Sequence, residues 1–122
     1  MPINFTQAER SALLRTLRTG RQNAIGARRL AQILGYPTGG NQVRLRSLIK
    51  ECIESDGDII GAATNRPAGF FIISSLTELE IYLDSLENRT DRNNNRRTAL
   101  INNWNNNPNT NPNTNKQIMT LQ

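Results

Sequence analysis

The sequence contains no histidine and only one cysteine, Cys52. Without histidine, the chain lacks both the commonest general base and the commonest metal ligand. A lone cysteine excludes an intramolecular disulfide and a cysteine-rich zinc site. The sequence also has no phosphate-binding glycine motif, no signal-peptide pattern and no apolar run near the ~20 residues of a membrane span. We therefore expect a non-enzymatic, cytoplasmic protein with no metal or other cofactor.

Charge is unevenly distributed along the 122 residues, whose formal net charge is +5. Residues 1–58 hold nine basic and five acidic groups, residues 76–88 hold four acidic groups and no base, and residues 89–104 are basic again. Because Lys and Arg displace the counterions of phosphates, this basic body favours a polyanionic partner. Plain solubility is the alternative explanation, and charge alone leaves it open.

The first half of the chain alternates short helix and strand signals. A capping box at Thr6–Glu9 starts a helix over 6–18, and a short strand over 23–25 leads into a helix over 27–34 that Gly35 ends. Residues 41–56 form a basic amphipathic helix with Leu45, Leu48, Ile49, Cys52 and Ile53 on its core face. Residues 58–63 and 68–73 read as a β-hairpin. The fold class we expect is mainly α with a small β-hairpin (α+β), in a domain spanning 1–75.

The second half begins with a capping box at Ser75–Glu78 that opens a long helix over 76–104. Apolar and polar residues repeat there every three and four positions, which predicts a heptad seam and a homodimer. The dimerisation residues expected from this pattern are Leu79, Leu83, Leu86, Asn93, Leu100 and Trp104. The alternative is that the first part of this helix packs on its own domain. Residues 105–122 form a low-complexity Asn/Pro/Thr tail, which we expect to be disordered.

The order helix, strand, helix, turn, basic helix and hairpin over about residues 5–90 resembles winged helix-turn-helix domains. More narrowly, Gly35-Tyr36, Arg46-x-Leu48-Ile49 and the hairpin 60–73 resemble small winged-helix proteins of phages and other mobile elements. The resemblance implies that helix 41–56 enters the major groove of double-stranded DNA. It also implies that the wing, residues 61–69, lies on adjacent backbone or minor groove. The six-residue turn 35–40 is long for this family.

Under this resemblance, a set of polar side chains becomes the predicted DNA contacts. Arg44 and Arg46 suit guanine edges or phosphates, and Gln42 suits adenine, whereas Asn41 is better explained as the helix N-cap. Ser47 and Lys50 suit phosphates, and Arg66 sits at the tip of the wing. The remaining predicted phosphate contacts are Arg28 and Arg29, for which simple solvation is an equal alternative.

Three functions compete at this stage. The first is a dimeric transcriptional regulator, located on the nucleoid of a bacterium or in the host cell if phage-encoded. The second is a protein–protein adaptor, or a phage-type inhibitor of a host protein, that docks through Leu100, Ile101 and Trp104. The third is a replication or partition factor that binds repeated DNA sites.

Overall fold

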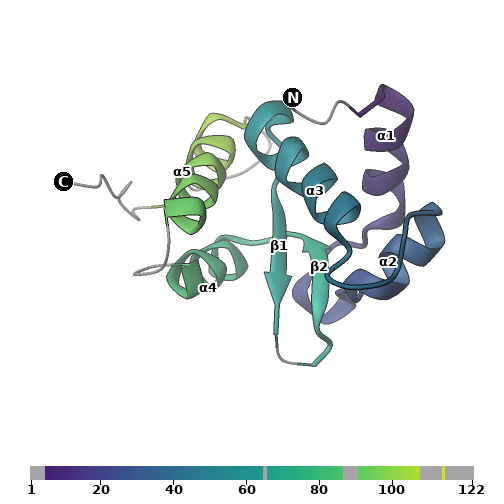
Figure 1. Cartoon of the computed structure of the whole chain (residues 1–122). Coiled ribbons are helices and arrows are strands. Elements are labelled where there is room, and N and C mark those ends of the chain that lie inside the picture. Colours follow the sequence, from purple (N-terminus) through teal and green to yellow (C-terminus); the bar gives the residue numbers. More distant parts are fainter. Residues whose placement is uncertain (1–4, 65, 87–90, 108–113, 115–122) are drawn as a thin grey trace.

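The computed structural model describes residues 5–64, 66–86, 91–107 and Thr114, with only the backbone for 91–94. The chain is mainly helical with one small antiparallel sheet, as expected. The elements are α1 (Gln7–Thr16), the short 3-10 helix η1 (Arg21–Asn23), α2 (Ala27–Leu34), α3 (Val43–Asp56), β1 (Ile60–Ala63), β2 (Gly69–Ile72), α4 (Leu76–Leu86) and α5 (Asp91–Asn106). In Figure 1, α1 and α2 lie on one side of the hairpin, α4 and α5 lie on the other, and α3 crosses between them.

Local sequence signals explain where the first helices begin and end. The Thr6 hydroxyl accepts the Glu9 amide and the Glu9 carboxylate accepts the Thr6 amide, which confirms the predicted capping box at α1. Gly35 at α2 and Gly57 at α3 both adopt the left-handed conformation that ends a helix. The predicted helix 27–34 is therefore confirmed, and α1 is slightly shorter than the predicted 6–18.

The hairpin is tied into the helical part through the segment between α1 and α2. β1 and β2 pair antiparallel, from Ile60 opposite Ile72 to Ala63 opposite Gly69. Ile25 adds two backbone hydrogen bonds to Phe70, with N–O distances of 2.9 and 2.8 Å. A two-stranded hairpin alone is marginal in water. The bridge at Ile25 fixes this hairpin beside the start of α2.

The single long helix predicted over 76–104 is wrong, because α4 ends at Leu86 and a separate α5 runs from Asp91 to Asn106. The predicted seam residues Leu79, Leu83, Leu86, Leu100 and Trp104 are all buried in the core of this one chain. α5 packs on α3 and α4, so the apolar residues at the end of the predicted seam are covered within this chain. They are therefore not exposed for pairing with a second subunit. The side chain of Asn93 falls outside the described residues.

α3 is the central element of the core. Its residues Leu45, Leu48 and Cys52 have no exposed surface, and they join one apolar cluster with residues from all the other named helices except η1 and from both strands. Fully burying one such side chain is worth about 1.5–3 kcal/mol. Because so much of α3 faces inward, its position is fixed, and only one narrow face is left for a partner.

Ser75 caps α4 as predicted, since its hydroxyl accepts the Glu78 amide, while the Glu78 carboxylate instead accepts the Ser74 and Arg21 amides. The predicted disordered tail falls largely outside the described residues. Thr114 within it is buried and donates its hydroxyl to Glu80 at 2.7 Å.

Candidate nucleic-acid interface

The outward face of α3 presents Val43, Arg46 and Lys50 at helical spacing. These three residues are exposed and follow one another at intervals of three and four, so they share one face of the helix. The opposite face supplies the core residues described above. The polar outward face was predicted from the sequence, and its geometry is confirmed.

A groove of about 610 Å³ lies along this face, between α3, β2 and α5. Ile49 and Phe70 contribute its apolar part, and Ser47 lines it as a half-buried hydroxyl. The groove is further lined by Asn41, Val43, Arg46, Lys50 and Arg96. It is therefore a positively charged hollow with an apolar floor.

The three cations of the groove are not neutralised by the chain itself. Within the described residues, Arg46, Lys50 and Arg96 make no ion pair with a carboxylate. By contrast, Arg10 pairs with Glu51 and Asp56, and Arg44 pairs with Glu9. These ion pairs lie between α1 and α3, and none of them involves a cation of the groove.

Arg46 is held in place although it is exposed. Its Nε donates to the Asn41 carbonyl at 2.6 Å, and its guanidinium carbon lies 5.7 Å from the centre of the Phe70 ring. The hydrogen bond uses Nε and so does not occupy the two terminal nitrogens of the guanidinium group. An arginine oriented in this way has less side-chain entropy to lose on binding a planar acceptor.

Arg44 does not join this group. It donates to Glu9 Oε2 at 3.0 Å, and its guanidinium lies 4.8 Å from the Phe5 ring centre and 5.3 Å from that of Tyr36. Tyr36 donates its hydroxyl to the same Glu9 oxygen at 2.6 Å. The side chain of Arg44, for which the sequence predicted a base contact, therefore joins α3 to α1 and to the loop after α2.

The contacts of Glu9 with Tyr36, Thr6 and Arg44 change the pKa of its carboxyl group. The Tyr36 hydroxyl, then the Thr6 amide and the Arg44 guanidinium, lower its pKa from 4.5 to about 2. Desolvation, together with the Glu9 charge, raises the pKa of Tyr36 to about 12. Glu9 thus stays ionised, and Tyr36 stays protonated, across the ordinary pH range.

The start of α3 also differs from the prediction. Gln42 rather than Asn41 is the N-cap, in the left-handed conformation with a φ of 51°, and it makes no side-chain cap bond. The side-chain nitrogen Nε2 of Gln42 donates to the carbonyl oxygens of Thr38 and Gly40, at N–O distances of 2.8 and 2.9 Å. Pairing with adenine needs those donors. Gln42 is consequently engaged in shaping the long turn.

The remaining predicted contacts lie away from the groove. Arg28 and Arg29 are exposed beside a separate hollow at the start of α2, which Gln32 and Thr38 also line. Arg66 is exposed on the loop between β1 and β2, which projects beyond the helices in Figure 1. The structure therefore brings Arg46, Ser47 and Lys50 together in one groove. Arg28, Arg29 and Arg66, like Gln42 and Arg44, do not line it.

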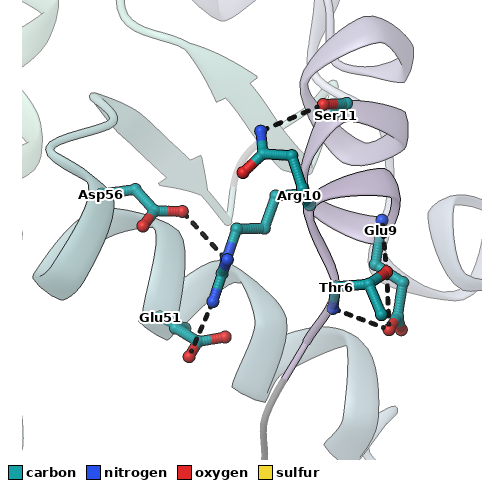
Figure 2. A network of polar contacts seen from close by, with 7 residues as sticks. Thr6, Glu9, Arg10, Ser11, Glu51 and Asp56 are labelled. Carbon is teal, nitrogen blue, oxygen red and sulfur yellow. Dashed lines mark hydrogen bonds and ion pairs between the residues drawn. The ribbon is translucent and has the colours of Figure 1, made fainter.

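A polar network between α1 and α3 accounts for the other charged residues near the site. In Figure 2, Arg10 reaches from α1 to Glu51 and Asp56 of α3, with N–O distances of 3.2 and 3.1 Å. Ligand atoms of Cys52, Asp56 and Asp58 lie within 4.8 Å of one another. Burial raises the pKa of the Cys52 thiol to about 12, so the thiol keeps its proton. The ion pairs of Arg10 hold α1 against α3.

Arg96 is the groove residue that sequence reasoning missed. It was counted only as part of a basic stretch in a continuous helix, and nothing in the sequence brings residue 96 next to residue 50. The separation of α4 from α5, and the packing of α5 on α3, place it there. Predicting this position of Arg96 would have required recognising that α4 and α5 are separate helices. The uninterrupted three-and-four spacing of the sequence instead indicated one helix.

Comparison with protein-family models, with curated proteins and with solved structures finds no match to this chain. None of the helices in the described ranges has both the length and the apolarity needed to cross a bilayer.

Proposed function

We propose that this chain is a winged helix-turn-helix protein that binds double-stranded DNA through the groove beside α3, as a transcriptional regulator. The observation that carries the proposal is the group of three cations, Arg46, Lys50 and Arg96, which line one groove and form no ion pair with a carboxylate in the part of the chain that the structure describes. The order of elements supports it, since a strand residue before α2 pairs with the hairpin that follows α3.

The charge arrangement favours a phosphate backbone over a small anion. The groove is open and elongated along a helix, and its cations come from both α3 and α5. A B-DNA major groove, about 12 Å wide, admits one helix, with cations on its flanks meeting phosphates on either side. Arg66, on the projecting hairpin loop, is then available to adjacent backbone or minor groove.

The test is the salt dependence of binding to a labelled duplex. Each phosphate contact removed should reduce the slope of log K against log salt by about 0.9. We expect this reduction for Lys50→Ala and Arg96→Ala. Arg15→Ala is the matched control, because Arg15 is exposed on α1 and lines no part of the groove. It removes the same charge and should leave the slope unchanged.

Two results would reject the proposal. One is a groove variant series that behaves like Arg15→Ala while circular dichroism shows folded protein. The other is a wild-type chain that does not bind duplexes even at ~50 mM salt, where non-specific electrostatic binding is strongest. Recovery of a discrete host protein in that second case would favour the adaptor function. The adaptor surface expected at Leu100, Ile101 and Trp104 lies in the core, so a different face would have to serve.

A further inference from the structure

Val43 is an exposed apolar side chain among the cations that line the groove beside α3. It is the first residue of α3 and is 69% exposed, more than Ile33 and Ile81, the other large apolar residues that are exposed within the described ranges. Single exposed apolar residues are ordinary on protein surfaces. Val43 differs from the other two because it lines the groove together with Arg46 and Lys50.

The helix itself gains nothing from valine at this position. A β-branched side chain lowers helix propensity, and an acidic residue in the first turn would stabilise the helix dipole. The first turn of α3 has no acidic residue. In the free protein the apolar surface of Val43 is exposed to water, and a partner with an apolar group at that point would cover it.

We propose that Val43 is a base-reading residue that contacts the 5-methyl group of a thymine in the major groove; this inference rests on the DNA binding proposed above. The thymine methyl is the one apolar group that an unmodified base pair presents there. Val43 lies at the N-terminal end of α3, the end of a recognition helix that approaches base edges. The flanking cations fix the helix on the backbone and bring Val43 to the bases.

The neighbouring Arg46 extends the inference to a short sequence. It follows Val43 by three positions, so the two Cβ atoms are about 5–6 Å apart, roughly two steps of a DNA strand. Its oriented guanidinium, anchored through Nε to the Asn41 carbonyl, matches the paired acceptors of guanine. The structure thus points to a site in which a thymine and a guanine lie within about two base pairs.

The experiment begins with selection of bound duplexes from a random library by the full chain. Each thymine of the selected site is then replaced singly by deoxyuridine, which deletes only the methyl group. One position should lose about fourfold in affinity, the effect of one buried methyl. In Val43→Ser that loss should shrink below twofold. Ile81→Ser, an equally exposed change on α4, should keep the fourfold loss.

The outcomes separate this inference from the proposed function. Selection of no DNA rejects both. Selected DNA without a consensus, or a consensus in which uracil costs nothing at every thymine, leaves DNA binding standing and rejects thymine reading. A uracil penalty that persists unchanged in Val43→Ser also rejects it, because another residue then reads the methyl. Circular dichroism of each variant confirms that the helix content is retained.

Discussion

Replacing Gly69 by alanine should weaken the attachment of the hairpin to the segment before α2 and destabilise the fold. A Cβ at Gly69 would lie 2.0 Å from the Ile25 carbonyl oxygen and 2.2 Å from its carbon, far inside contact distance. The φ of Gly69 is +134°, a conformation that L-residues rarely adopt. The obstacle is backbone, so no side-chain rotation can relieve it.

The expected loss in the free energy of unfolding follows from the interactions that the added Cβ disrupts. Moving Gly69 away from Ile25 breaks the two hydrogen bonds between Ile25 and Phe70, which contribute about 0.5–1.5 kcal/mol each. Keeping the bonds instead forces alanine into a strained conformation at about 1–3 kcal/mol, besides the clash. Either way we expect the free energy of unfolding to fall by about 3 kcal/mol. This is a large share of the roughly 5–15 kcal/mol typical of a domain.

Urea denaturation followed by circular dichroism measures this loss directly. Gly39→Ala is the matched control, because no atom lies within 4 Å of its added Cβ and its φ is not positive. It should be neutral or slightly stabilising, by up to about 1 kcal/mol. A Gly69→Ala protein whose stability is within 1 kcal/mol of wild type would refute the reasoning, since the close approach to Ile25 could not then be real.

Three further predictions concern polar and thiol groups. Asn103→Ala should lower the free energy of unfolding by about 1–3 kcal/mol, because its amide donates to the Ile53 and Asp58 carbonyls at the end of α3. The urea midpoint should fall as pH drops from about 4.5 to about 2, because the Glu9 pKa is depressed in the folded state and its stabilisation is present only above that window. Cys52 should fail to react with a thiol reagent at pH 8 until the chain unfolds, because burial raises its pKa to about 12.

Each of these has its own control. Asn102→Ala removes an exposed asparagine from the same helix and should change stability by less than about 0.5 kcal/mol. Glu9→Gln should be less stable near neutral pH and should show a shallower decline through the acid window; an equal decline would place the titration elsewhere. Labelling of Cys52 that precedes the urea transition would contradict its burial.

The N-terminal half was predictable because its signals are local. A capping box, left-handed glycines and one apolar helix face are read within a few residues of one another, and α2, α3 and the hairpin appear where those signals predict them. The contacts that Arg44 makes within the chain were not predictable, for the opposite reason. Its partners Glu9 and Tyr36 lie 35 and 8 positions away, so only the packing of α1 against α3 brings them together.

The C-terminal half shows the limit of periodicity. The same three-and-four spacing serves one long helix or two helices that fold back on a shared core, and it does not distinguish them. Asn103 lies within the predicted helix 76–104, where the asparagine-rich composition gave it no individual role. In the fold its side-chain amide donates to carbonyls at the end of α3. Composition described the residue type and could not single out the position that makes this contact.

Helix α5 carries both Trp104, which lies in the core, and Arg96, which lines the groove. Trp104 is the chain's only tryptophan, so its fluorescence reports the docking of α5 without any added label. Loss of that docking on unfolding exposes the indole to water, so the same signal follows the urea transition of the segment that carries Arg96.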